Sequence, residues 1–410
     1  MSLAFWVYLA VFVVFLACGA PIYMALLSSG LSYAFLHGGI DNMAIMAKMY
    51  GSLDSFVLLA IPMFMAAGII MNNGGITDRI FNFCRALLGH LPGGLAYVNV
   101  LASFLFSGMS GSALADVGGL GSVEIKAMRD EGYDDDTIFG ITAASVSVGT
   151  LFTAGVGPGL AIGLILCIAV FIVAKRRGYK VHKRATLREV LHCIRRSFFA
   201  LLLPAIIMGG IMCGYFTPTE ASCIAITYCI LVVCFIYRDM PFRQLLRVVN
   251  ETVSGIVPAL AIVSSASLFG WVLQFEHLGE KMYNGITSLT DNKWVILLII
   301  DVILLFFGMI LDSTPTIMLL VPIFQPLTQA VGISPIHLGV IVVLNLMIGL
   351  MTPPYGQSLF MLSGTTGVHF NKIVKYVMPW LLPMFIALLA VTFIEPITLA
   401  IPIMLGFTVF

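Results

Sequence analysis

Charged side chains are scarce in this chain of 410 residues. Asp, Glu, Lys and Arg make up only 10% of it, whereas a soluble domain has roughly 25%. Hydrophobic residues make up 60%, and the mean hydropathy is +1.04. The apolar runs are long and continuous, which excludes a β-barrel with its short alternating segments. The composition therefore predicts an all-α integral membrane protein, and the net charge of +1 gives no sign of a nucleic-acid partner.

Motifs for ATP binding and for hydrolysis are also missing. The chain contains no GxxxxGK[ST], HExxH or GxSxG pattern. The eight cysteines lie mostly in or beside apolar runs and form neither a CxxC pair nor a metal-ligand spacing with histidine. We interpret them as small buried hydrophobes. We therefore expect no enzyme activity, no cofactor and no energy from ATP bound to this chain.

The basic residues that are present gather in two connections between apolar segments. The longer one, KRRGYKVHKRATLREVLHCIRR, covers residues 175–196, and the shorter one, YRDMPFRQLLR, covers 237–247. Two apolar segments, 198–213 and 220–237, separate them, so both connections lie on the same side of the membrane. The positive-inside rule makes that side cytoplasmic. The apolar N-terminus has no basic region before it and is expected to remain as the first span.

The two halves of the chain resemble each other weakly. A shift of 200 positions places SFLFSGMSGSALAD (103–116) on ILLFFGMILDSTPT (303–316). Internal repeats with broken segments at corresponding positions are typical of secondary transporters and mark their binding sites. The same shift matches three pairs of glycines: Gly108 with Gly308, Gly132 with Gly332, and Gly149 with Gly349.

The register of this repeat changes after Gly149. Pro158 aligns best with Pro379, at a shift of 221, so the first half is 21 residues shorter at this point. The first half therefore has no counterpart of the second-half sequence TPPYGQSLF.

Two consecutive prolines interrupt the apolar stretch NLMIGLMTPPYGQSLF at residues 345–360. Proline removes a backbone donor and stops a helix. A helix that enters the membrane, stops here and returns leaves unpaired carbonyl groups, which suit a hard cation such as Na⁺. Asn345, Thr352 and the carbonyl groups around Gly349 are the candidate ligands. The alternative is a structural helix with a proline kink.

The preceding segment, GMILDSTPTIMLL (308–320), carries an intramembrane carboxylate at Asp312 and a predicted helix break at Pro315. Such carboxylates are costly and by default mark a functional site. Asp312 is a candidate to ligate the cation or to receive polar groups of a substrate. Alternatively, it caps the helix that follows. Asp301 also lies in an apolar run, but nothing in the sequence places a partner near it.

The first-half counterpart, FSGMSGSALADVGGLGS (106–122), is rich in serine and closely spaced glycine. Small residues of this kind allow close helix packing, which is the structural interpretation. The functional interpretation is a second cation site lined by oxygen atoms. Its candidate residues are Ser110, Ser112 and Asp116, completed by Ser145 and Ser147 ahead of Gly149.

At these segments the sequence closely resembles the large, DctM-like membrane subunit of tripartite ATP-independent periplasmic (TRAP) transporters. The resemblance implies a multi-pass protein of the bacterial inner membrane, with inverted repeats, re-entrant helical hairpins and an elevator mechanism. It also implies import of organic acids with Na⁺ as the coupling ion. The implied partners are a small four-span membrane subunit, supplied by another chain, and a periplasmic substrate-binding protein. The matching stretches are 58–80, 87–116, 214–222, 311–323 and 332–360.

The resemblance carries two Na⁺ sites onto this sequence. One comprises Ser110, Ser112, Ser145 and Gly149. The other comprises Gly308, Asp312, Asn345, Gly349 and Thr352. We expect the substrate to contact Asp116, Ser147, Asp312, Pro353 and Gln357.

The chain departs from the family pattern where its first half is short. SVSVGT (145–150) runs directly into LFTAGVGPGL (151–160), whereas the family carries a GPIIPPS-like tip after the serine-rich turn. The missing residues leave the first site incomplete, so we expect weak Na⁺ coupling with little or no transport. Two alternatives remain open: a transport-impaired variant that acts as a membrane scaffold, and an unrelated ion channel.

The repeat and the basic connections suggest a division of the chain into five parts. We expect scaffold helices in 1–92, the first transport repeat with its shortened hairpin in 93–174, and a cytoplasmic loop with scaffold helices in 175–292. The second transport repeat with its hairpin is expected in 293–375, and a C-terminal helix in 376–410.

We predict that residues 175–196 face the cytoplasm. A Lys180→Cys substitution in a cysteine-free chain should react with a membrane-impermeant maleimide only after the inner membrane is opened. Labelling from the periplasmic side of intact inner membranes would reverse the assigned orientation.

Overall fold

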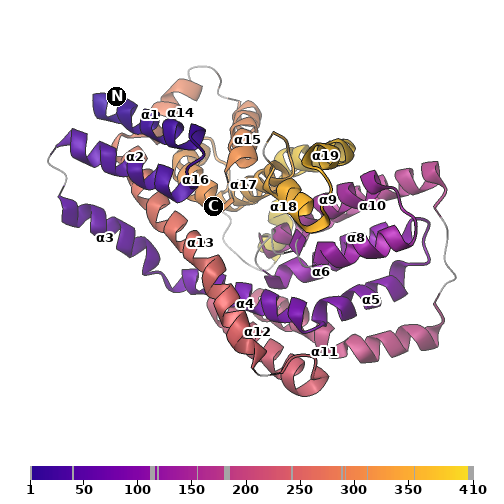
Figure 1. Ribbon diagram of the computed structural model, residues 1–410. Helices are drawn as coiled ribbons and strands as arrows, with labels where there is room; N and C mark the ends of the chain where they lie inside the picture. The colour runs from indigo at the N-terminus through magenta and orange to yellow at the C-terminus, as the bar shows by residue number, and fades with distance from the viewer. Residues whose placement is uncertain are drawn as a thin grey trace.

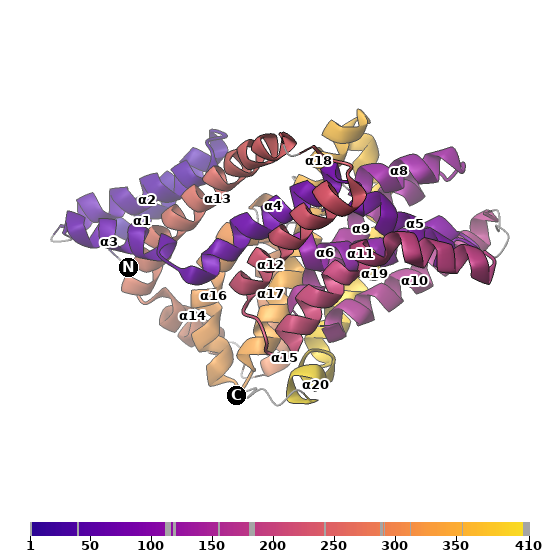
Figure 2. The ribbon, with the colours of Figure 1, turned by 90° about the horizontal axis from the view of Figure 1, so that it is seen from below.

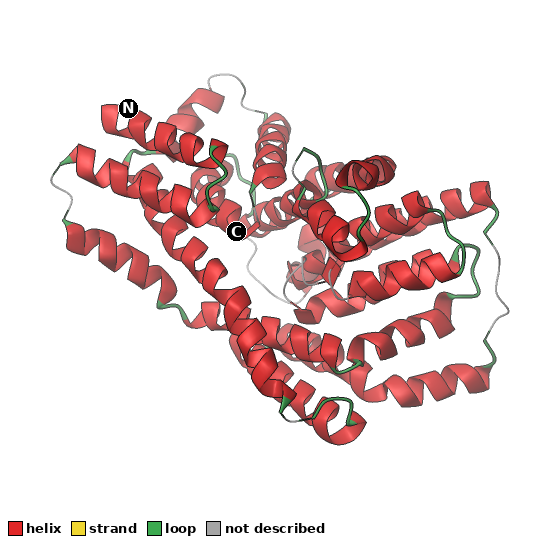
Figure 3. Cartoon of the chain, in the orientation of Figure 1, coloured by secondary structure: helices red, strands yellow, loops and turns green. Residues whose placement is uncertain are grey.

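The computed structural model describes residues 2–38, 41–110, 116–117, 120–154, 156–179, 185–241, 243–287, 290, 292–311, 313–354 and 356–404. Every regular element in this part of the chain is a helix, as predicted (Figure 3). The elements are α1 (Leu3–Ala17), α2 (Ile22–His37), α3 (Asn42–Leu53), η1 (Phe56–Leu59), α4 (Ala60–Asn73), α5 (Ile76–Leu88), α6 (Gly94–Ser110), α8 (Leu120–Asp130), α9 (Asp135–Ala154), α10 (Val156–Arg177), α11 (Leu187–Met212), α12 (Pro218–Ile230), η2 (Leu231–Tyr237), α13 (Gln244–Phe275), α14 (Leu278–Thr287), α15 (Lys293–Ile310), α16 (Ser313–Ala330), α17 (Pro335–Leu350), α18 (Gln357–Thr366), α19 (Phe370–Phe393) and α20 (Pro396–Met404).

Six helices in the described part are long and apolar enough to cross a bilayer, which takes about 20 residues. Other apolar helices, such as α17 and α6, are shorter. The longest, α13, runs across the molecule between the α1–α3 group and α4 with α12 (Figure 1). The long spans are Gly157–Arg177, Arg188–Ile211, Pro218–Tyr237, Gln244–Phe275, Lys293–Ile310 and Phe370–Phe393.

The helix order reproduces the repeat that the sequence predicts. In each half, an amphipathic helix (α5 or α14) precedes two helices that pack against each other (α6 with α8, and α15 with α16). A third helix follows, α9 at Asp135 and α17 at Pro335. The turn before it contains a left-handed glycine in both halves, Gly132 at φ +80° and Gly332 at φ +74°. Only glycine adopts this conformation without strain, which explains the matched glycines.

Helix α17 lies at the centre of the molecule (Figure 2). It packs against α9, α15, α16 and α19, and most of its residues are buried. Two hydrophobic clusters meet on it: one joins α4–α12 and α19, and the other joins α1, α2, α13, α15 and α16. Because different residues of α17 belong to each cluster, this helix joins the two.

The halves differ after their third helix. Helix α17 ends at Leu350, and a six-residue break separates it from α18. In the first half α9 ends at Ala154 and α10 begins at Val156, with no helix equivalent to α18 between them. The apolar segment 137–174 is thus two helices, which pack against each other. Helix α18 packs mainly on α19 and to a smaller extent on α17 and α9, and the return of the chain after the break stays a prediction.

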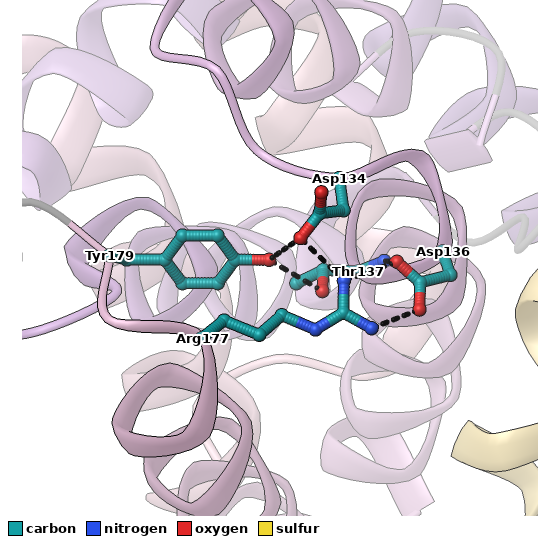
Figure 4. Close-up of polar contacts among 5 residues, drawn as sticks. All are labelled: Asp134, Asp136, Thr137, Arg177 and Tyr179. Carbon is teal, nitrogen blue, oxygen red and sulfur yellow. Dashed lines mark hydrogen bonds and ion pairs between the residues drawn. The ribbon is translucent and has the colours of Figure 1, made fainter.

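The end of α10 is tied to the start of α9 by a polar cluster (Figure 4). Arg177 donates to Asp134 and Asp136, at 2.6 Å for Nη1 to each carboxylate. The Tyr179 hydroxyl donates to Asp134 at 3.1 Å and lies 2.9 Å from the Thr137 hydroxyl. Part of the basic 175–196 segment is therefore neutralised by the acidic turn before α9. The cluster fixes α9 and α10 as an antiparallel pair.

Candidate functional site

Side-chain hydroxyls satisfy the backbone where α17 ends. Thr352 Oγ1 donates to the carbonyl of Ile348 at 2.6 Å, and Ser358 Oγ donates to that of Leu350 at 2.7 Å. The carbonyl of Gly349 accepts from the backbone N–H of Thr352 at 3.0 Å. The expectation of wholly unpaired carbonyls is therefore wrong. Each hydroxyl gives its hydrogen to a carbonyl and keeps its own oxygen lone pairs for another partner.

Two glycines let α15 and α17 touch just before this break. A Cβ atom on Gly349 would lie only 2.5 Å from the carbonyl carbon of Gly308. A Cβ atom on Gly308 would lie 3.2 Å from Cα of Leu346. The two predicted site residues Gly308 and Gly349 are thus brought together, backbone against backbone.

Asn345 lies one helical turn before Gly349 and is fully buried. Its Nδ2 donates to Asp301 Oδ1 at 2.7 Å and to the carbonyl of Ile341 at 3.0 Å. Its Oδ1 accepts no hydrogen bond from the described part of the chain. A buried acceptor without a partner costs about 1–3 kcal/mol. The oxygen predicted to bind a cation is therefore one that needs a partner.

Asp301 is the site residue that sequence reasoning left without a partner. Its Oδ1 accepts from Asn345, and its Oδ2 accepts from Thr392 Oγ1 of α19 at 2.9 Å. Both donors lie on other helices, 44 and 91 residues away in sequence. The only local signal was an acidic residue inside an apolar run.

Around the break, the other predicted residues are placed as follows. Asp312 lies outside the described residues, between the end of α15 and the start of α16. The predicted helix break at Pro315 lies earlier in the structure, before α16 begins at Ser313. Pro315 itself lies in the first turn of α16, where proline is tolerated. Pro353 is partly exposed in the break. Gln357 begins α18, and its buried Oε1 has no hydrogen-bond partner in the described structure.

The first half has a polar cluster of its own between α6 and α9. Ser145 is fully buried; it accepts from Ser103 Oγ at 3.1 Å and donates to the carbonyl of Thr142 at 3.2 Å. Asn99 Nδ2 donates to Thr142 Oγ1 at 2.9 Å. Ser145 and Asn345, which match at the shift of 200, thus both bond to the first helix of their hairpin.

Other predicted residues of the first half are less completely described. Ser112 lies outside the described residues, and the side chains of Ser110 and Ser147 lie outside the described part as well. Ser110 ends α6, while Ser147 and Gly149 lie within α9. Helix α9 continues past Gly149 to Ala154, whereas α17 ends one residue after Gly349. The first half therefore has no break at the matching position.

Two carboxylates are buried beside this first-half cluster. Asp116, a predicted substrate contact, is 2% exposed, and Glu124 of α8 is 1% exposed. Ser103 Oγ donates to Glu124 Oε1 at 3.5 Å. Sequence reasoning missed Glu124 because α8 is amphipathic, and its charged residues read as one solvated face.

Comparison with known proteins relates this arrangement to one family. The profile of the "Tripartite ATP-independent periplasmic transporter, DctM component" family matches residues 9–146 and 136–397, so the match divides within α9. The sialic acid TRAP transporter large permease protein SiaM of Vibrio cholerae is 38% identical over 408 residues, covering 94% of this chain and 96% of that protein. The C4-dicarboxylate TRAP transporter large permease protein DctM of Pseudomonas aeruginosa is 37% identical, covering 91% and 92%.

Among solved structures, the fold is similar to that of the YdaH transporter of Alcanivorax borkumensis. The TM-score is 0.63 over 90% of this chain and 95% of YdaH, at 13% sequence identity. At this identity the likeness concerns the fold alone.

We predict that Gly349→Ala destabilises the α15–α17 contact. The new Cβ would meet the backbone of Gly308, which cannot yield as a flexible side chain does. Overpacking of this kind costs typically 1–3 kcal/mol, so the purified chain should unfold at a lower temperature. Gly339→Ala on the same helix is the matched control, because its Cβ would meet no atom within 4 Å. Equal unfolding temperatures for the two variants would show that the glycine contact is not tight.

Proposed function

Because this chain belongs to the DctM family of TRAP transporters, we propose that it imports organic acids in symport with Na⁺. The family consists of transporter permeases of the bacterial inner membrane and not of enzymes. As the large permease, the chain would act with a small four-span membrane subunit and a periplasmic binding protein that delivers the substrate. Both partners are proposed from the family.

The observation that carries Na⁺ coupling is the buried Oδ1 of Asn345, which has no hydrogen-bond partner among the described residues. It lies on the buried face of α17, next to the glycine contact and one turn before the helix ends. Na⁺ prefers oxygen ligands, and broken helices supply them in secondary transporters. We assign the second-half site to Asn345, Thr352, Asp312 and the backbone at Gly308 and Gly349.

The substrate is proposed to be a carboxylate. The relatives named for sialic acid and for C4-dicarboxylates both handle organic acids of this kind. Helix α18 begins behind Gly356, which offers no capping side chain, so its first N–H groups favour a negative charge. Gln357 is the first residue of α18, and the second hairpin supplies Asp312. We propose that they bind polar groups of the substrate, together with Asp116, Ser147 and Pro353.

We propose an elevator mechanism in which the two hairpin repeats move as one transport domain. This domain comprises residues 93–174 and 293–375. The grouping is supported by the polar clusters, which join each hairpin to its own third helix. Residues 1–92 and 175–292 form the scaffold, and 376–410 form the C-terminal part. Helix α17 contacts both α9 and α15, which supports joint motion of the repeats.

The missing helix in the first half supports a second candidate, a permease with impaired transport. Helix α9 continues through Gly149 without a break. The first half therefore lacks a helix end that would supply further cation ligands beside Ser110, Ser112 and Ser145. The second half keeps its break and its buried amide oxygen. We therefore propose one complete Na⁺ site, in the second half.

The test is uptake by proteoliposomes that contain this chain, its small subunit and its binding protein. An inward Na⁺ gradient should drive concentrative uptake of a radiolabelled C4-dicarboxylate or sialic acid, and an equal K⁺ gradient should not. With one complete site, the Na⁺ dependence should have a Hill coefficient near 1. Asp312→Ala should abolish coupled uptake while the chain remains folded and inserted.

Three outcomes would change the assignment. Uptake that never exceeds equilibrium would favour a channel. Wild-type transport by Asp312→Ala would make Asp312 structural. No uptake until a 21-residue tip is inserted after Gly149 would identify the transport-impaired variant.

A further inference from the structure

Asp301 is a buried carboxylate whose charge has no nearby cation in the described part of the chain. It is 3% exposed, and none of the ion pairs formed by the described residues includes it. Its two oxygens are held instead by neutral donors, Asn345 Nδ2 on α17 and Thr392 Oγ1 on α19. An isolated buried charge is costly, so residues retained in this state usually serve a function.

The contacts of Asn345 fix which way its amide points. Its Nδ2 faces two acceptors, Asp301 Oδ1 and the carbonyl of Ile341. An amide oxygen placed there would meet two oxygens and form no hydrogen bond. The NH₂ group must therefore occupy this side, and Oδ1 is directed to the other side, where no described residue bonds to it.

We propose that Asp301 is a positioning residue for the Na⁺ site. It binds the NH₂ group of Asn345, so that Oδ1 is presented to the cation before the cation arrives. It also supplies a negative charge one amide group away, in apolar surroundings that screen the charge weakly. This inference rests on the proposed function, because it takes Asn345 Oδ1 as a Na⁺ ligand.

The position of Asp301 is itself held by a longer network. The backbone carbonyl of Thr392 lies 3.2 Å from His337 Nε2, and His337 Nδ1 lies 2.7 Å from Thr398 Oγ1. Thr392 is thus fixed by α17 on one side while its hydroxyl holds Asp301 on the other. The three helices α15, α17 and α19 converge on one carboxylate, which limits its freedom to turn away from Asn345.

A carboxylate with a purely structural role would also hold three helices together. The test must therefore measure the affinity for Na⁺ as well as the stability of the chain. The unfolding temperature of the full chain, purified in detergent, is followed as Na⁺ replaces K⁺ at constant ionic strength. The Na⁺ concentration that gives half of the stabilisation reports affinity. The absolute unfolding temperature without Na⁺ reports structural damage separately.

The variants separate orientation from charge. Asp301→Asn keeps an acceptor for the amide of Asn345 and removes the charge, whereas Asp301→Leu removes both. Residues that orient a metal ligand typically contribute 10–100-fold to metal affinity, so half-saturation should rise about tenfold for Asp301→Asn and further for Asp301→Leu. Thr392→Val should raise it less. Thr328→Val is the matched control, because that buried hydroxyl bonds, among the described residues, only to carbonyls of its own helix.

A double variant tests whether Asp301 acts through Asn345. In an Asn345→Ala chain, Asp301→Leu should raise half-saturation no more than Asp301→Asn does, because only the charge of Asp301 still acts on the site. Unchanged half-saturation in both Asp301 variants, together with a rise in Asn345→Ala, would overturn the role of Asp301 and leave the Na⁺ site intact. Absence of Na⁺-specific stabilisation in the wild-type chain, or a half-saturation in Asn345→Ala equal to that of the wild-type chain, would overturn both the site and this inference.

Discussion

A helix that ends in a buried, apolar region must satisfy its last carbonyl groups without water, and α17 meets this constraint with hydroxyls. Thr352 and Ser358 donate to the carbonyls of Ile348 and Leu350. Because these bonds stabilise the break, α18 can begin a few residues later with its N–H groups uncapped by a side chain. The glycine contact between α15 and α17 brings the break against the hairpin. The candidate site exists because the backbone can stop there.

The two halves use the same scaffold for different chemistry. In each, a residue on the third helix, Ser145 or Asn345, bonds to the first helix of the hairpin. The second half adds a carboxylate, Asp301. It also has a helix break, which begins within two turns after Asn345. The first half has hydroxyls and buried acids, but its third helix, α9, continues through Gly149 without a break. The same arrangement of helices thus holds the Asn345 amide oxygen beside a helix break in the second half. At the matching position of the first half, the helix has no break.

The sequence predicts the features that depend on neighbours along the chain. The prolines of the break and the matched turn glycines are local signals, and the structure places the end of α17 and both left-handed turns accordingly. The partners of Asp301 could not be predicted, since they come from two other helices. The packing of α18 on α19 could not be predicted, because a proline break fixes where a helix stops but not which helix the next one contacts. Glu124 was missed, since burial of a polar helix face depends on neighbouring helices.

The central claim is that one half of the chain holds a complete Na⁺ site and the other does not. Counting the Na⁺ bound at saturation tests this most directly, by equilibrium binding of ²²Na⁺ to the purified full chain. We predict one Na⁺ per chain. Two Na⁺ per chain would show that the first half binds a cation without its break, and no bound Na⁺ would contradict the site at Asn345.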